Sequence, residues 1–179
     1  MRPITPKSFS MFLAVAAALG VGACGNKTSS IHNAETEGIY LNVGPLKYQV
    51  EISRQLNPRA IPEDKTFVQG IDPAQATLAP DELWFAVFVR VENETHQAQI
   101  PASFFQITDT EGTVYRPVDI NDQNPFYFNT SPIRAQGVAP DPDSVAGQLG
   151  SIGGMELLFK VKRTSLDNRP LVLTIKSIS

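Results

Sequence analysis

Alternation of apolar and polar residues is the main pattern in this chain from residue 46 onward. In the first such stretch apolar residues recur at every second position from residue 46 to residue 52, with Leu56 as a candidate end: Leu46, Tyr48, Val50, Ile52 and Leu56. Side chains that repeat with a period of two lie on one face of a strand. The pattern therefore predicts one half-buried antiparallel strand over residues 46–56.

Five later stretches also predict strands. Residues 83–91 are apolar on one face throughout and on the other face from Trp84 to Phe88, which is typical of a central strand. Residues 105–107 and 114–115 flank a turn in which Gly112 supplies the positive φ that a tight hairpin needs. Two further strands are predicted at residues 155–161 and 171–175, and no stretch of ten residues has a helical period.

Short strands separated by turn residues predict the fold class. The chain has 14 prolines and 12 glycines, and most of them lie between the apolar stretches. This arrangement favours an all-β, Ig-like antiparallel two-sheet β-sandwich over a fold built from alternating strands and helices. We find no internal repeat and predict a single domain over residues 39–179.

The N-terminal pattern is different. Arg2 and Lys7 precede an apolar run from Met11 to Ala23 without any acidic residue, as in a signal peptide. The run is shorter than the roughly 20 residues that a transmembrane helix needs. We therefore predict a signal peptide over residues 1–23.

The residues that end this run, Val21-Gly22-Ala23-Cys24-Gly25, resemble the lipobox of bacterial lipoproteins. The resemblance implies that Cys24 receives a diacylglycerol group and that cleavage occurs before it. The alternatives are an ordinary secretory signal with an incidental cysteine, or a buried cysteine in a cytosolic protein. Cys24 is the only cysteine, so no internal disulfide is expected. The small and polar residues 24–38 predict a flexible tether.

The charge of the exported part bears on its partners. Of 15 basic residues, Arg2 and Lys7 fall in the signal peptide, which leaves 13 against 18 acidic residues. The basic residues are scattered, except for a group at Lys160–Arg163 that is interpreted as a solvated strand face. Nucleic acids are bound by clustered basic residues, so we expect no nucleic-acid partner.

From about residue 83 to the end, the chain resembles a widespread bacterial family of Ig-like lipoprotein domains of unknown function, related in fold to a secreted immunogenic antigen of mycobacteria. The segments that carry the resemblance are Trp84–Thr95, Phe105–Asp109 with Glu111, Gly112 and Tyr115, Glu156–Val161, and Leu171–Ile175. The usual Pro-Gly pair before the late strand is absent, and Ser144–Gly154 is rich in glycine instead. The family implies the fold and the location but no catalytic residue.

The sequence gives little indication of a metal site or of catalytic residues. His32 and His96 are the only histidines, and a zinc site needs three or four ligands. We expect no cofactor, no metal and no enzyme activity. The segment from Asp119 to Asn124 carries oxygen ligands that suit calcium, but it lacks the spacing of an EF-hand. A polar turn with Asx hydrogen bonds is the favoured interpretation, and calcium binding stays open.

Three consecutive aromatic residues, Phe126, Tyr127 and Phe128, form the one candidate partner-binding site. They either present a contact surface or fill the open end of the sandwich. In an extended segment Tyr127 points away from its neighbours, so it is the residue expected to be exposed.

Together these features predict a membrane-anchored extracytoplasmic lipoprotein that acts as a binding or accessory domain. Its partners are the membrane, through the lipid on Cys24, and an unknown protein or small-molecule ligand. The alternatives are a structural envelope-assembly factor and, last, a hydrolase. In a host with two membranes, Gly25 after the cysteine favours the outer membrane.

Overall fold

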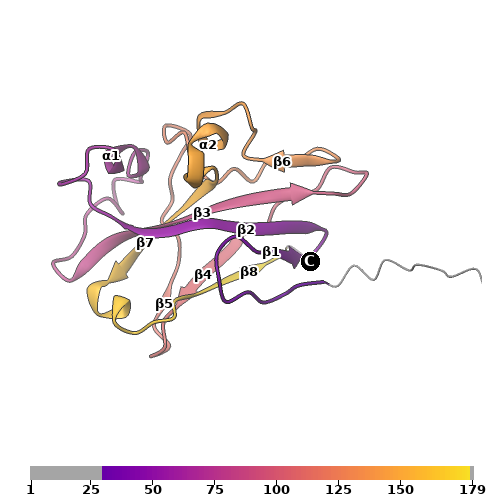
Figure 1. The fold of residues 1–179 in the computed structure, drawn as a ribbon. Helices are drawn as coiled ribbons and strands as arrows, with labels where there is room; N and C mark the ends of the chain where they lie inside the picture. The colour runs from indigo at the N-terminus through magenta and orange to yellow at the C-terminus, as the bar shows by residue number, and fades with distance from the viewer. Residues whose placement is uncertain (1–29, 178–179) are drawn as a thin grey trace, which may run out of the picture.

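A computed structural model describes residues 30–177, which form two antiparallel sheets (Figure 1). The larger sheet contains β1 (Tyr40–Val43), β2 (Leu46–Leu56), β3 (Glu82–Asn93), β6 (Gly137–Ala139) and β7 (Met155–Lys162). The smaller sheet contains β4 (Phe104–Thr108), β5 (Val114–Tyr115) and β8 (Val172–Lys176). The predicted all-β sandwich is therefore confirmed.

The sheets have simple connectivity. The larger sheet runs β1-β2-β3, and β3 then pairs with β7 along most of its length and with β6 near its end. The smaller sheet runs β5-β4-β8. Four short helical segments lie between the strands: α1 (Asp64–Phe67), α2 (Val145–Gln148), η1 (Gly150–Ile152) and η2 (Arg163–Leu166). No helix in residues 30–177 has the length and apolar character required to cross a membrane.

The predicted strands are found within one or two residues of their expected positions. The hairpin at Gly112 is also confirmed, because β4 and β5 pair and this glycine has a φ of 82°. The pattern missed β1 and β6, which have four and three residues. Strands of that length are too short for alternation to be recognised.

β3 is buried on both faces and connects two hydrophobic clusters. Its inner residues, among them Phe85, Val87 and Val89, join Phe105 and Ile107 of β4 between the sheets. Its outer residues Trp84, Ala86 and Phe88 belong to a second cluster on the far side of the larger sheet. Phe85 and Phe105, which lie on the apolar faces of two predicted strands, are only 6% and 5% exposed.

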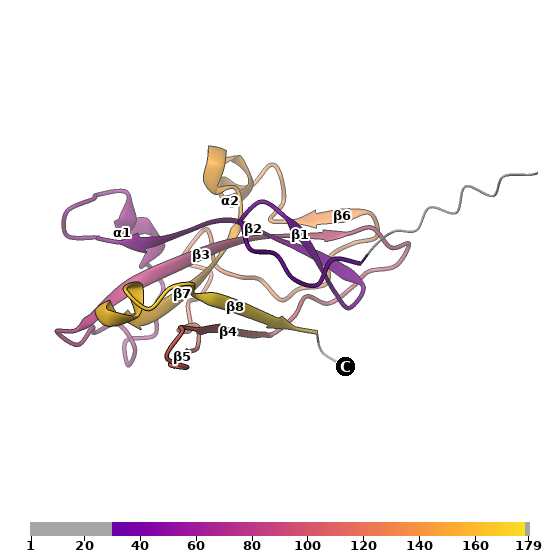
Figure 2. The same ribbon diagram turned by 60° about the horizontal axis from the view of Figure 1, so that its bottom comes forward.

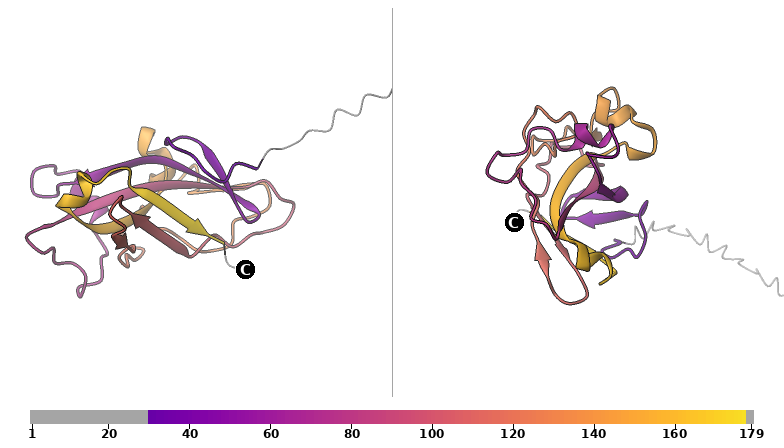
Figure 3. Two further views of the ribbon diagram at one scale, coloured as in Figure 1. Left: turned by 90° about the horizontal axis from the view of Figure 1, so that it is seen from below. Right: turned by 90° about the vertical axis from the view of Figure 1, so that its left-hand side faces the viewer.

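The second cluster is covered by connecting segments. α1 and α2 lie on the side of the larger sheet that faces away from the smaller sheet (Figures 1, 2 and 3). From this cover, the rings of Phe67 and Phe126 pack against Phe88, with centroids 5.0 and 6.2 Å from it. The sandwich therefore has a third, irregular layer that protects the outer face.

A β-bulge in β2 corrects the prediction that its apolar residues share one face. Val50 pairs with Val89 but Ile52 pairs with Phe88, so one extra residue, Glu51, interrupts the register. Because an extra residue reverses the alternation, Val50 packs against the inner cluster while Ile52 and Leu56 pack against the outer one. Ser53 consequently pairs with Val87 on the inner face.

We predict that Phe88→Ala lowers the free energy of unfolding by about 3–5 kcal/mol, as expected when a fully buried ring leaves a cavity. Phe88 is 0% exposed. Urea denaturation measures the loss, with Val172→Ala as the control because this side chain is 53% exposed and should contribute less than about 0.5 kcal/mol. Equal, small losses in both variants would show that the outer cluster is not a stabilising core.

Candidate functional site

The predicted site residues fall into separate places. Cys24, the predicted lipid attachment site, lies outside the described residues, as does the start of the predicted tether. The later part of that tether contacts the sandwich: Asn42 donates its N–H to the Ile31 carbonyl at 2.7 Å, and Gly38 donates to the Val50 carbonyl at 2.8 Å. The predicted boundary at residue 39 therefore falls within a segment that lies against the larger sheet.

Phe126, Tyr127 and Phe128 do not form a common exposed surface, which corrects the expected geometry of a partner-binding patch. Phe126 is 2% exposed and belongs to the outer cluster. Phe128 packs against the inner cluster, with its ring 4.7 Å from that of Phe105. Tyr127 is half-buried, and its backbone pairs with Glu156 at the margin of β7.

The cause is a turn at Asn124. The Asn124 side chain accepts a hydrogen bond from the Phe126 N–H at 2.8 Å, and its carbonyl accepts one from the Tyr127 N–H at 3.1 Å. The segment is therefore not extended at Phe126, and the alternation on which the expectation rested does not apply. Instead the chain passes the edge of β7 and places one phenylalanine on each side of the larger sheet.

The segment from Asp119 to Asn124 is a polar turn with the expected Asx hydrogen bonds. The Asn121 side chain accepts a hydrogen bond from the Gln123 N–H at 3.0 Å. Within residues 30–177 no group of three or more His, Cys, Asp or Glu residues is placed to hold a metal ion. Of the histidines, His96 is exposed and His32 lies 3.0 Å from the Asn42 carbonyl oxygen.

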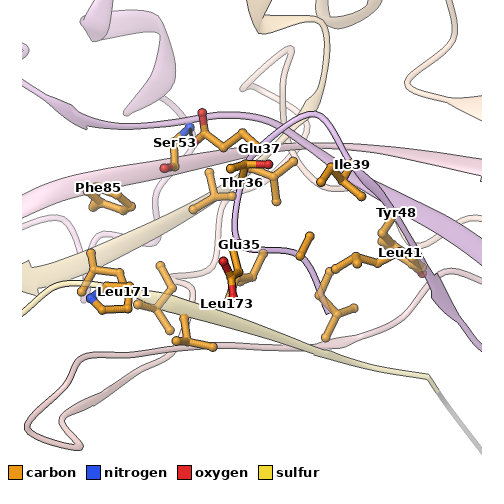
Figure 4. Close-up of a pocket in the computed structure, with 17 residues that line it drawn as sticks. Glu35, Thr36, Glu37, Ile39, Leu41, Tyr48, Ser53, Phe85, Leu171 and Leu173 are labelled. Atoms are coloured by element: carbon orange, nitrogen blue, oxygen red, sulfur yellow. Dashed lines mark hydrogen bonds between the residues drawn. The ribbon is translucent and has the colours of Figure 1, made fainter. Parts of the chain in front are cut away.

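An apolar cavity of about 480 Å³ lies between the sheets (Figure 4). The larger sheet contributes Leu41 of β1, Val50 of β2 and Phe85 of β3, and β8 of the smaller sheet contributes Leu173. Residues 34–37 also line the cavity, and Figure 4 labels Glu35, Thr36 and Glu37 on the segment that crosses it; these residues are exposed to solvent. Sequence analysis missed this cavity.

The bulge explains part of the cavity. Because Ile52 and Leu56 face outward beyond Glu51, the inner face of β2 carries the small Ser53 opposite Val87, and both residues line the cavity. The smaller sheet has three strands against five in the larger sheet, and it ends at β8, which lines the cavity. The space that a larger side chain or another strand would fill stays open between β2 and β8.

Residues 31–38, which we call the strap, cover the free edge of β2. β1 pairs with β2 only at residues 46–49, which leaves the edge of β2 from Val50 onward without a neighbouring strand. The strap supplies the missing partners: Gly38 donates to the Val50 carbonyl at 2.8 Å, and Glu37 accepts from the Ser53 N–H at 2.6 Å. It thus protects an edge that would otherwise expose unpaired backbone groups.

A group of polar side chains is buried beneath the outer layer. The Glu156 side chain is 1% exposed, and one carboxyl oxygen accepts a hydrogen bond from Asn124 Nδ2 at 3.0 Å while the other has no partner. Nearby, Arg54 forms an ion pair with the fully buried Asp64. Burial raises the pKa of Glu156 to about 8, despite the opposing effects of the Asn124 hydrogen bond and the Arg54 charge.

Glu156 was not predicted as a special residue. The alternation of β7 places it on the presumed solvent face, and only the covering layer buries it. Glu156 is not part of the wall of the cavity between the sheets. The group is therefore poorly placed to meet a substrate, and the cavity between the sheets is the better candidate for function.

Comparisons with known protein families, with curated proteins and with solved structures find no match to this chain.

The sealed carboxyl predicts a pH dependence of stability. The unfolded chain should ionise Glu156 near its ordinary pKa of 4.5, whereas the folded chain holds the proton until about pH 8. Stability from this group is complete below pH 4.5, falls as the pH rises, and is lost above about pH 8. Between pH 4.5 and 8 the free energy of unfolding of the parent protein should fall by on the order of 2–4 kcal/mol because of Glu156, and Glu156→Gln should abolish this fall.

Thermal unfolding between pH 4.5 and 8.5 measures this effect. The variant should match the parent protein at the acidic end and exceed its melting temperature at the alkaline end. Glu111→Gln is the matched control, since Glu111 is exposed in the β4–β5 turn. Parallel melting curves for Glu156→Gln and the parent across the whole interval would contradict the raised pKa.

Proposed function

We propose that this chain is an exported lipoprotein, held at a membrane by lipid on Cys24, whose sandwich domain binds an elongated apolar molecule in the cavity between its sheets. The cavity is the single observation that carries the binding role. Its wall comes from both sheets and is mainly apolar, and it meets solvent at the exposed strap residues that line it. The export and lipid anchor rest on the N-terminal sequence.

The size of the cavity suits a small ligand. Ligand sites in proteins usually enclose about 300–1,000 Å³ and are lined mainly by apolar side chains, and this cavity encloses about 480 Å³. An engineered apolar cavity of about 150 Å³ binds benzene. Roughly three times that volume accommodates a molecule with on the order of 18 carbon atoms.

The strap supports a link between the anchor and the cavity. Glu35 lines the cavity and follows Cys24 by 11 residues, which span at most about 40 Å when fully extended. An anchored chain therefore keeps the cavity within that distance of the bilayer surface. Amphiphiles that leave the membrane would meet the opening without long diffusion.

The anchor is tested by Cys24→Ser. The variant should lose labelling by palmitate and appear unprocessed or soluble on fractionation, while its circular dichroism shows a folded β protein. Firm attachment to a membrane requires more than one acyl chain. In this proposal the diacylglycerol group on Cys24 supplies these chains, so the loss of this one residue removes the anchor. Ser30→Ala, in the same N-terminal region, is the control and should leave labelling intact. Continued processing and labelling of Cys24→Ser would disprove the lipobox assignment.

The binding role is tested by filling the cavity. Ser53→Phe places a ring on the inner face of β2, and it should weaken the binding of decanol at least tenfold in calorimetric titration because the apolar volume is occupied. Ser103→Phe adds the same ring at an exposed position outside the cavity and should bind as the parent does. Unchanged affinity in a folded Ser53→Phe variant would place any binding elsewhere.

A further inference from the structure

The charge around the cavity narrows the class of its ligand. Among the 17 residues drawn around it in Figure 4, the acidic ones are Glu35 and Glu37, and none is lysine, arginine or histidine. Neither carboxylate belongs to an ion pair within residues 30–177. The wall therefore combines an apolar interior with an uncompensated negative margin.

Both carboxylates lie on the strap, and both residues are exposed, so they mark the solvent side of the cavity. In Figure 4 Glu35 lies between the strap and Leu173 of β8, and Glu37 lies beside Ser53 of β2. The Ser53 N–H fixes one oxygen of Glu37 at 2.6 Å. A molecule whose hydrocarbon part occupies the interior thus places its polar end near these two groups.

We propose that the cavity selects a single hydrocarbon chain that carries a positively charged head group, such as a long-chain amine. This inference rests on the proposed function, since it names the class of molecule that the cavity binds. The apolar wall accepts the chain, and Glu35 and Glu37 attract the cation at the opening. A carboxylate or phosphate head would meet the same charges with repulsion.

The volume restricts the ligand to one chain. About 480 Å³ corresponds to on the order of 18 carbon atoms by the benzene comparison, which leaves no room for two chains of membrane-lipid length. A single-chain amphiphile fits this volume, and the negative charges of Glu35 and Glu37 then select among amphiphiles with different head groups.

The experiment compares three ligands of equal chain length on the full chain with Cys24→Ser, which carries no acyl group of its own. Decylamine, decanol and decanoate present a cationic, a neutral and an anionic head at pH 7. Calorimetric titration at low salt should show the amine bound roughly tenfold more tightly than the carboxylate, with the alcohol between them. The ratio should shrink in 0.5 M salt, since screening weakens exposed charges.

Matched variants separate the charge from the cavity. Glu35→Gln with Glu37→Gln should bring the amine-to-carboxylate ratio close to one and leave decanol binding unchanged, because glutamine keeps the oxygen that accepts from Ser53. Glu63→Gln with Glu111→Gln removes two exposed carboxylates outside the cavity. That control should keep the tenfold preference.

The outcomes distinguish this inference from the proposed function. Equal binding of the three ligands, or tighter binding of decanoate, overturns the selection for a cation while the binding role stands. Binding of none of them by the folded chain overturns the proposed function itself. If the lipidated chain binds none while the Cys24→Ser chain binds them, its own acyl group is the occupant, and the proposal of a free ligand is overturned.

Discussion

One extra residue in β2, Glu51, decides which side of the larger sheet each half of the strand serves. Before the bulge, Tyr48 and Val50 face the smaller sheet, and after it Ile52 and Leu56 face the outer layer. A strand without the bulge would direct all of these side chains into the inner core. The outer cluster would then lose two apolar contributors, and the cavity beside Ser53 would be filled. Both the third layer and the candidate site thus depend on this local break in register.

The outer layer stabilises the sheet at the expense of sealing polar groups beneath it. Burial of Phe88 between Phe67 and Phe126 removes a large apolar area from water. The same cover encloses Arg54 with Asp64, and Glu156 with Asn124. Arg54 and Asp64 pair opposite charges with each other, whereas Glu156 has only an amide partner, and its burial raises its pKa. We therefore expect the stability of this side of the molecule to depend on pH.

The strap connects edge protection with binding. It pairs with the part of β2 that β1 leaves uncovered, through Gly38 and Glu37, and Glu37 also lines the cavity together with Glu35 and Thr36. A movement of the strap would expose both the strand edge and the apolar interior. Because the strap continues toward Cys24 in sequence, an anchored chain would hold this opening close to the membrane, where single-chain amphiphiles are available.

The sequence by itself determined the strands with long alternating patterns, β2, β3 and β7, and the hairpin at Gly112, because period-two burial and a positive φ are local requirements. The lipobox at Cys24 stays a prediction from a linear signal, since Cys24 lies outside the described residues. Only the tertiary structure decided the faces of Ile52 and Leu56, the separation of Phe126 from Phe128, the burial of Glu156 and the cavity itself. Each of these depends on contacts between segments distant in sequence, or on a one-residue shift in pairing that leaves the alternation of residue types unchanged. Local periodicity predicts that a side chain is buried, but it does not predict which residues that side chain packs against.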